Sequence, residues 1–160
     1  MKQLSSTLAL ICIALAVITF SITACSDETP ASKNDSATES NITSAEDQYL
    51  KGVVCYYTED YSEAVKWFRK AAEQEHVKAQ FELARCYTLG EGVTENQVEA
   101  VKWFRKAADQ GHVEAQGALG VLYYEGVGTT KNQVEGIKLL RKAAEGGSES
   151  ARGFLRDHGY

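Results

Sequence analysis

One hexapeptide occurs three times along the chain at a constant spacing, and this spacing constrains the fold more than any other feature. Residues 67–72 read Trp-Phe-Arg-Lys-Ala-Ala, and residues 103–108 repeat these six residues unchanged. Residues 139–144 carry the related Leu-Leu-Arg-Lys-Ala-Ala, so both intervals are 36 residues long. A fixed period of this size is typical of proteins built from stacked structural repeats. The sequence therefore predicts a repeat protein.

The hexapeptide lies in the more clearly helical half of each repeat. Apolar residues at positions 64, 65, 67, 68, 71 and 72 fall on one helical face, and the cations at 66, 69 and 70 fall on the other. An acceptor side chain begins each of these segments, and a glutamate follows three residues later. This is the pattern of a capping box, in which both side chains bind free backbone N–H groups of the first helical turn. The pairs are Asp60 with Glu63, Asn96 with Glu99 and Asn132 with Glu135.

The other half of each repeat also carries an apolar face at helical spacing. Alanine, leucine and tyrosine recur there four residues apart, at Ala79, Leu83 and Tyr87 and again at Ala115, Leu119 and Tyr123. Glycine-rich turns at residues 90–92 and 126–128 separate the two halves and do not suit a helix interior. We therefore expect each repeat to be an antiparallel pair of helices joined by a glycine-containing loop.

Taken together, these motifs resemble the Sel-one-like repeat, a relative of the tetratricopeptide repeat. The resemblance is carried by Ala-x3-Leu-Gly-x2-Tyr, by Gly-x-Gly-Val and by Ala-x2-Trp-Phe-Arg-Lys-Ala-Ala. It implies an all-α fold, a right-handed α-solenoid of seven helices in stacked antiparallel pairs, with the first helix of each pair on the concave side. We assign repeat units to residues 46–76, 77–112 and 113–148, and a C-terminal capping helix to 149–160.

Three residues depart from the repeat pattern. Glu75 stands where the next unit has glycine, Gly136 stands where the other units have alanine, and Lys51 stands where they have leucine. The first unit also lacks the glycine loop and resembles the shorter tetratricopeptide form. These departures leave the register of the first unit open by a residue or two.

The N-terminal segment predicts export. Lys2 precedes an apolar run over residues 8–20, which is too short to span a bilayer and suits a signal peptide over residues 1–24. Residues 22–25 (Ile-Thr-Ala-Cys) resemble a bacterial lipobox, which implies cleavage before Cys25 and its lipidation. The alternative is an ordinary cut near Ala24 and a soluble secreted protein. Residues 25–44 then form a polar segment without aromatic residues, which we expect to be a disordered tether.

The same resemblance predicts a place in the cell. Ser26 stands where a lipoprotein retained at the inner membrane would carry aspartate. We therefore expect a cell-envelope protein, anchored in the outer membrane by its lipid and facing the periplasm, although a surface-exposed orientation stays open. The formal net charge of −5 argues against a nucleic-acid partner. We expect a monomer that binds another protein.

Cations recur on the exposed face of the hexapeptide helices. In one interpretation these cations are attracted to the anionic headgroups of the anchoring membrane. In the other, which we favour, they form an ordinary solvated face. In that case the arginines pair with acids four residues later. The expected pairs are Arg69 with Glu73, Arg105 with Asp109 and Arg141 with Glu145.

Neither catalysis nor a metal site is indicated. Some cysteine-rich relatives are linked to β-lactam binding or hydrolysis, but the chain has no Ser-x-x-Lys and no Lys-Thr-Gly motif. His76 and His112 lie 36 residues apart at one repeat position, so we interpret them as polar residues at helix junctions rather than metal ligands. No catalytic residue and no cofactor are predicted, and a β-lactam enzyme stays the least favoured alternative.

Two cysteines, Cys55 and Cys86, belong to the repeats, on the first helices of neighbouring units. A disulfide between them requires Cα atoms within about 7 Å, whereas packed helix axes lie about 8–10 Å apart. In the cysteine-rich relatives the bridges join the two helices of one repeat, and each unit here has one cysteine. A disulfide is therefore possible, with buried free thiols as the favoured alternative.

The favoured functional site is the concave groove. In tetratricopeptide-like solenoids, particular positions of the first helices contact the ligand. Aromatic residues and an arginine that the core does not need are typical of a binding hot spot. Carried onto this sequence, the positions are Tyr49, Val53, Tyr56, Tyr57, Phe81, Arg85, Thr88, Leu89, Gly117, Val121 and Tyr124.

The predicted function is therefore a protein-interaction scaffold or adaptor of the bacterial envelope, which buries a peptide or helix of its partner in this groove. The alternative is an immunity protein that neutralises a secreted toxic effector, as some lipoproteins of this family do. An immunity protein forms one tight stoichiometric complex, whereas an adaptor forms several weaker ones.

Overall fold

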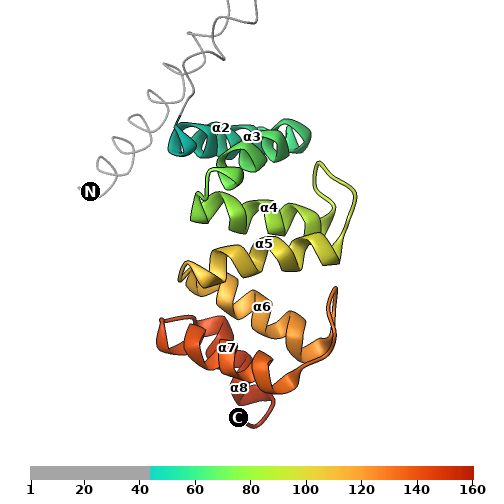
Figure 1. Cartoon of the computed structure of the whole chain (residues 1–160), viewed down its shortest axis with the longest axis vertical. Helices are drawn as coiled ribbons and strands as arrows, with labels where there is room; N and C mark the ends of the chain where they lie inside the picture. Colours follow the sequence, from blue (N-terminus) through green and yellow to red (C-terminus); the bar gives the residue numbers. More distant parts are fainter. Residues whose placement is uncertain (1–43) are drawn as a thin grey trace, which may run out of the picture. The chain divides into compact units, whose positions relative to one another are not determined.

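The computed structural model describes residues 44–160 of the chain. This part contains seven α-helices and no strand: α2 (Ala45–Tyr57), α3 (Tyr61–Glu73), α4 (Val77–Leu89), α5 (Gln97–Asp109), α6 (Val113–Glu125), α7 (Gln133–Glu145) and α8 (Glu149–Asp157). They follow one another in sequence order along the long axis, from α2 at one end to α8 at the other (Figure 1). The main contacts join consecutive helices. The predicted all-α solenoid of helix pairs is confirmed.

The helix bounds define the register of the repeats. The first helices α2, α4 and α6 are each 13 residues long and begin at residues 45, 77 and 113. Tyr49, Phe81 and Gly117 therefore occupy one helical position in three successive units. The first unit is shorter because residues 58–60 alone link α2 to α3, whereas residues 90–96 link α4 to α5.

Each second helix begins with the predicted capping residue, but the expected box is only half formed. The backbone N–H of Glu63 donates to Asp60 Oδ1 at 3.2 Å, while the Glu63 carboxylate turns away to Lys66 Nζ at 2.9 Å. The reason lies in the cap residue itself. The backbone N–H of Asp60 already donates to the Cys55 carbonyl at 2.9 Å, so the glutamate has no free donor to reach. The same arrangement recurs at Asn96 and Asn132.

The glycine loops dock on the preceding unit. Gly92 and Gly128 have positive φ values of 69° and 66°. A Cβ on Gly92 would lie 2.1 Å from the carbonyl oxygen of Tyr61, at the start of α3, and one on Gly128 would lie 2.4 Å from that of Gln97, at the start of α5. Only glycine suits both the backbone angle and this approach. Both loops project on the same side of the stack in Figure 1.

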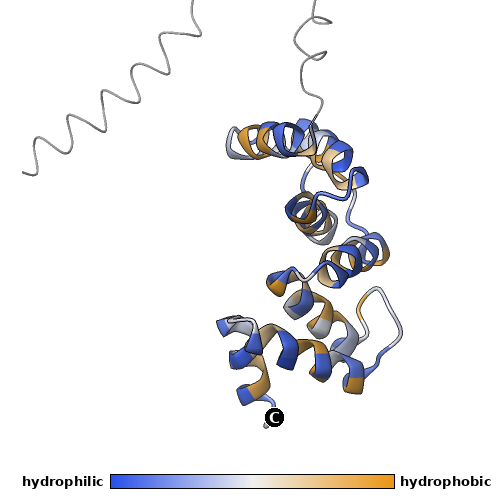
Figure 2. Ribbon diagram, turned by 60° about the vertical axis from the view of Figure 1, so that its left-hand side comes forward, coloured by the Kyte–Doolittle hydropathy of each residue, from blue (hydrophilic) through white to orange (hydrophobic). Residues whose placement is uncertain are grey.

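The core is built from small residues at the helix crossings and large ones between them. Ala64, Ala71, Ala100 and Ala107 are fully buried in α3 and α5, and Phe68 is 1 % exposed. Hydrophobic and hydrophilic segments alternate along the helix ribbons in Figure 2, as expected for helices with one buried face. The main cluster extends over α2–α6, and a smaller one joins α7 to α8.

Gly136, which departs from the alanine of the other units, faces another glycine. A Cβ on Gly136 would lie 2.7 Å from the Gly120 carbonyl oxygen, and one on Gly120 would lie 2.9 Å from the Gly136 carbonyl oxygen. The two backbones therefore approach more closely than an alanine pair allows. The departure is a packing device of the α6–α7 pair.

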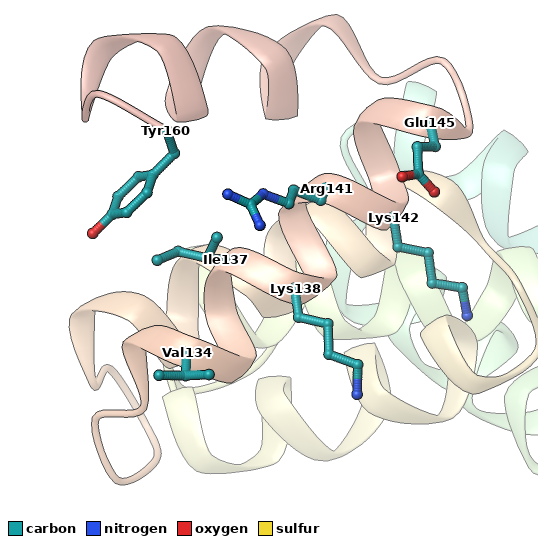
Figure 3. A pocket seen from close by; sticks show the side chains of 7 residues that line it. All are labelled: Val134, Ile137, Lys138, Arg141, Lys142, Glu145 and Tyr160. Atoms are coloured by element: carbon teal, nitrogen blue, oxygen red, sulfur yellow. The ribbon is translucent and has the colours of Figure 1, made fainter.

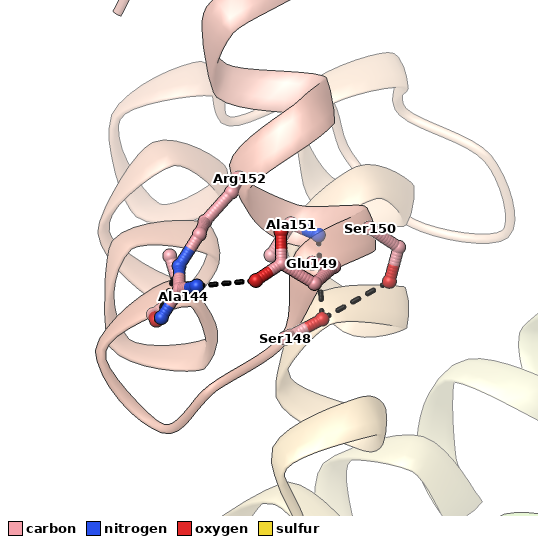
Figure 4. A network of polar contacts seen from close by, with 6 residues as sticks. All are labelled: Ala144, Ser148, Glu149, Ser150, Ala151 and Arg152. Atoms are coloured by element: carbon pink, nitrogen blue, oxygen red, sulfur yellow. Dashed lines mark hydrogen bonds and ion pairs between the residues drawn. The ribbon is translucent and has the colours of Figure 1, made fainter.

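Buried polar side chains tie each unit to the next at one repeat position. Gln80 Nε2 donates to the Ala72 carbonyl at 3.3 Å, and Gln116 Nε2 donates to the Ala108 carbonyl at 3.1 Å. In α8 an arginine takes this role, since Arg152 Nε and Nη2 donate to the Ala144 carbonyl at 3.2 and 3.1 Å (Figure 4). Helix α8 is thus a fourth first helix, docked as its predecessors are.

Several predictions concern residues 1–43, which lie outside the described part. These are the signal peptide over 1–24, the lipidation of Cys25 and all of the tether over 25–44 except its last residue. Ser44 is described, and its side chain caps α2 by accepting from the backbone N–H of Asp47 at 3.0 Å. Among the described residues, no helix has the length and hydrophobicity needed to cross a bilayer.

Candidate functional site

Two hollows lie side by side along the first helices, and they share Arg85. The smaller has a volume of about 110 Å³ and the larger about 500 Å³. We call the surface that contains both hollows the groove. The small hollow is lined by Tyr49, Val53, Tyr56, Tyr57, Phe68, Glu82 and Arg85. The large hollow is lined by Phe81, Arg85, Phe104, Glu114, Gly117, Ala118, Val121, Leu140, Ser150, Ala151 and Phe154.

Arg85 and its neighbours form a polar ridge between the hollows. Arg85 Nη1 donates to Glu82 Oε2 at 2.7 Å, and the guanidinium lies 6.0 Å from the ring centre of Tyr56. Tyr56 Oη donates to Glu91 Oε2 at 2.7 Å. This hydrogen bond, with burial and the Glu91 charge, raises the pKa of Tyr56 to about 12. At neutral pH Tyr56 is therefore a fixed donor, and Arg85 keeps further N–H groups for a ligand.

Aromatic rings of the groove stack on the histidines that cap the following helices. The Tyr49 ring lies 4.7 Å from that of His76, and the Phe81 ring lies 4.6 Å from that of His112. His76 Nδ1 accepts from the backbone N–H of Ala79 at 3.1 Å, which makes each histidine both a helix cap and a support for a groove ring. The interpretation of these histidines as junction residues agrees with this geometry.

Three of the predicted groove residues line neither hollow. Thr88 Oγ1 donates to the Ala84 carbonyl of its own helix at 2.9 Å. Leu89 is 56 % exposed at the end of α4. Tyr124 packs edge-on against Phe154, with ring centres 5.2 Å apart, so the C-terminal helix covers it. Thr88 and Leu89 lie at the end of α4 and Tyr124 contacts α8, so these three side chains lie beside the two hollows, and their part in binding stays a prediction.

Sequence reasoning missed residues that the groove contains. Phe154 belongs to α8, which we interpreted only as a cap, and Glu82 and Glu114 are charged residues that the aromatic pattern did not select. The 36-residue period held a usable signal, because it places Phe154 at the position of Ala118. The cap contributes a wall of the large hollow.

Both repeat cysteines are free thiols. Burial, followed by the charges of Glu82 and Glu91, raises the pKa of Cys86 to about 12. Burial also raises the pKa of Cys55, which is less enclosed. In the part of the chain from residue 44 onward, no three histidine, cysteine or acidic side chains converge to hold a metal ion.

We expected the arginines of the second helices to pair with acids four residues later, but in the structure they do not. Arg69 Nη2 donates to Tyr87 Oη at 2.5 Å, and Arg105 bonds Tyr123 in the same way. The lysines instead pair with glutamates three residues earlier, as in Lys102 with Glu99 at 2.5 Å. The tyrosines belong to the next unit, so these arginines connect units rather than form a purely solvated face.

A further hollow of about 600 Å³ lies outside the groove, on the exposed face of α7. Figure 3 shows Ile137 and Arg141 pointing toward Tyr160 of the C-terminus, and Lys138 and Lys142 along the opposite edge. Ile137, Arg141 and Tyr160 lie at the end of the stack, where α8 ends after nine residues. This hollow combines cations with apolar side chains but contains none of the residues predicted for the groove.

Comparisons with known proteins agree with the repeat architecture. The profile of the Sel1 repeat family matches residues 49–76, 77–112 and 113–148. A Sel1 repeat protein from Oxalobacter formigenes is 41 % identical, with a TM-score of 0.63, over 72 % of this chain and 49 % of that one. A protective antigen of uropathogenic Escherichia coli with an SLR fold is 36 % identical, with a TM-score of 0.69, over 76 % of this chain and 27 % of the other.

Cysteine rich protein B of Helicobacter pylori shares the fold at 23 % identity, with a TM-score of 0.55, over 71 % of this chain and 98 % of its own. The chain spans about a quarter of the Escherichia coli protein and about half of the Oxalobacter protein. The search among curated proteins found no significant match.

Proposed function

The chain belongs to the Sel1 repeat family, whose members generally mediate protein–protein interaction, and from this premise we propose that the groove of this solenoid binds a partner protein. The observation that carries the proposal is the position of Arg85 between two hollows walled by aromatic residues. Arginine and aromatic side chains in partly enclosed pockets are the residues that dominate protein-binding energetics.

The groove also has the rigidity that a binding surface needs. Its rings are held in place by stacking on His76 and His112, and Tyr56 is held by Glu91. A partner that binds here orders few side chains of the solenoid, so little of the interaction energy is lost to conformational entropy. A peptide or a helix laid along α2, α4 and α6 contacts both hollows at once.

We further propose that the protein acts in the bacterial envelope as a scaffold or adaptor, anchored through lipidated Cys25 in the outer membrane and facing the periplasm. The support is the lipobox-like sequence over residues 22–25 and the serine that follows it. Replacing Cys25 with alanine is expected to move the protein from the membrane fraction to the soluble fraction. An unchanged distribution contradicts the anchor.

The test of the groove is affinity capture from detergent-solubilised envelopes, with wild type beside a Tyr56→Ala/Phe81→Ala/Arg85→Ala variant. A matched control carries Val134→Ala/Ile137→Ala/Arg141→Ala in the hollow on α7. We expect a stoichiometric partner that the groove variant loses and the control keeps. Circular dichroism of both variants checks that they fold. A partner retained by the groove variant contradicts the proposal.

A further inference from the structure

The third repeat unit lacks a ring that the first two units have. Tyr49 stacks on His76 and Phe81 stacks on His112, each pair crossing from a first helix to the cap of the next one. The same two positions of the third unit hold Gly117 and Ser148. Both partners of the stack are therefore replaced by small residues, and the 500 Å³ hollow opens at this place.

Gly117 is not required by the backbone. A Cβ built on it meets its nearest neighbours, Ala143, Ser148 and Ala151, at 3.7–3.9 Å, which is ordinary contact. Its φ is not in the left-handed region. This differs from Gly120, whose Cβ would lie 2.9 Å from a carbonyl oxygen. Neither packing nor backbone conformation requires glycine at position 117. The missing side chain therefore leaves free volume in the large hollow.

The walls of the hollow suit an aromatic ring. Phe81 of α4 and Phe154 of α8 both line it, and the buried side chains of Phe104 and Leu140 form part of the lining. The Phe154 ring is held by stacking on His158, with ring centres 4.1 Å apart. Aromatic rings prefer offset or edge contacts with other rings at centre distances of about 4.5–7 Å. The hollow offers such contacts on more than one side.

Glu114 supplies a negative charge at the hollow. Glu114 lines the hollow, and its carboxylate lies 3.3 Å from His112 Nδ1. That nitrogen accepts the backbone N–H of Ala115, so it carries no proton for Glu114 while the cap is intact. The cation Arg85, which also lines the hollow, is ion-paired with Glu82. Helix α6 itself carries Glu114 and Glu125 and no cation.

We propose that the hollow at Gly117 receives an aromatic side chain of the partner protein, with a lysine or arginine beside it that meets Glu114. The incoming ring takes the place that the Tyr49 and Phe81 rings have in the first two units. This inference rests on the proposed function of the groove and names the chemistry of what one part of it binds.

Small probes test the hollow without knowledge of the partner. Phenethylamine carries a ring and a cation, 3-phenylpropionate a ring and an anion, and butylamine a cation alone. Titration of the ¹⁵N-labelled protein followed by NMR should show saturable shifts with phenethylamine at Gly117, Val121 and Phe154. For nine heavy atoms the expected Kd is on the order of 1–10 mM. We expect 3-phenylpropionate to bind about fivefold more weakly and butylamine to give no saturable shift.

Two variants and a control make the result specific. Gly117→Phe restores the ring of the other units, and it should abolish phenethylamine binding without lowering the melting temperature. Leu89→Phe adds the same side chain to an exposed site that lines neither hollow, and it should leave binding unchanged. Glu114→Gln should remove the preference for phenethylamine over 3-phenylpropionate.

Three outcomes overturn the inference: no saturable shift in the wild type, equal binding by a folded Gly117→Phe variant, or tighter binding of 3-phenylpropionate. The two proposals fail separately. A captured partner that is lost with the Tyr56→Ala/Phe81→Ala/Arg85→Ala variant but kept by Gly117→Phe upholds the groove and refutes the ring site. A partner kept by both variants refutes the groove as well.

Discussion

The guanidinium of Arg69 donates from Nη2 to the phenolic oxygen of Tyr87 at 2.5 Å, which joins the second helix of the first unit to the first helix of the next. Arg105 and Tyr123 repeat this contact in the following unit. Both pairs are 18 residues apart, which is half of the repeat period. The residue at this distance from Arg141 is Gly159, so the equivalent position of the last unit has no tyrosine hydroxyl.

This difference allows an internal comparison of the arginines. Tyr87→Phe removes only the hydroxyl of a buried ring, and we expect it to lower the free energy of unfolding by about 1 kcal/mol and the melting temperature by about 3–5 °C. Arg141→Ala should change stability by less than about 0.5 kcal/mol, because Arg141 is exposed and a glycine stands 18 residues after it. Thermal unfolding followed by circular dichroism measures both. Equal effects of the two substitutions contradict a structural role for the bond.

Glu75 is a non-glycine residue in the left-handed region, with φ of 62°, where the next two units have Gly111 and Gly147 with φ of 90° and 104°. Glu75→Gly should relieve this strain and stabilise the protein by about 0.5–1 kcal/mol. Lys70→Gly, in the last turn of α3, should instead destabilise it by about 0.5–1 kcal/mol. Chemical denaturation of the two variants checks the opposite signs, and a loss of stability in Glu75→Gly argues against strain at this position.

An added methyl group should have opposite effects on stability at two helical glycines, of which only Gly136 lies where α6 and α7 approach closely. Gly136→Ala would place its Cβ 2.7 Å from a carbonyl oxygen, so we expect a loss of about 1–3 kcal/mol. Gly153→Ala in α8 meets only the end of the Arg156 side chain at 3.9 Å and should stabilise the helix by about 0.5–1 kcal/mol. Urea unfolding compares them. A neutral Gly136→Ala variant shows that the helices can separate at no cost.

His112 makes stability depend on pH. Burial, the largest influence, lowers the pKa of His112 below its usual value of 6.5, and its neutral Nδ1 accepts the backbone N–H of Ala115 at 3.3 Å. The folded state therefore binds the proton more weakly than the unfolded state. The contribution of neutral His112 to the free energy of unfolding is fully present above about pH 6.5. It is lost as the pH falls toward the lowered pKa of His112. His112→Asn keeps a capping side chain without this titration.

The measurement is the midpoint of urea unfolding from pH 7.5 to 5 for wild type and His112→Asn. We expect the wild type to lose stability relative to the variant as the pH falls. Because the variant lacks the stack on Phe81, its stability is lower over the whole pH range. Parallel curves for the two proteins contradict the link between His112 protonation and folding.

The two thiols should differ in reactivity. Cys86 is 1 % exposed and its pKa is raised to about 12, so the folded protein should resist its alkylation by iodoacetamide at pH 8. Cys55 is only half-buried and should react first, although slowly, because its pKa is also raised. Mass spectrometry of the alkylated peptides distinguishes them. A Cys55–Cys86 crosslink in the non-reduced protein contradicts the free thiols.

Much of the groove could be predicted from the repeat period. Positions that recur on first helices point the same way once their register is known. The predicted residues that line the two hollows include Tyr49, Val53, Tyr56, Tyr57, Phe81, Arg85 and Val121. Thr88, Leu89 and Tyr124 do not, because each lies near the end of its helix, where the period does not define the neighbouring loop or helix. The sequence indicated that the first unit lacks the glycine loop, but only the helix bounds defined the register of that unit.

By itself the sequence determined the helix pairs, their order and the turns between them, because helical periodicity, capping residues and glycines act over a few neighbouring residues. Only the tertiary structure decided which polar groups met and where space was left. The arginines bonded tyrosines of the next unit, and the glycine at position 117 opened a hollow while that at 136 closed a helix crossing. These outcomes depend on distances between residues of different helices, which no local pattern contains.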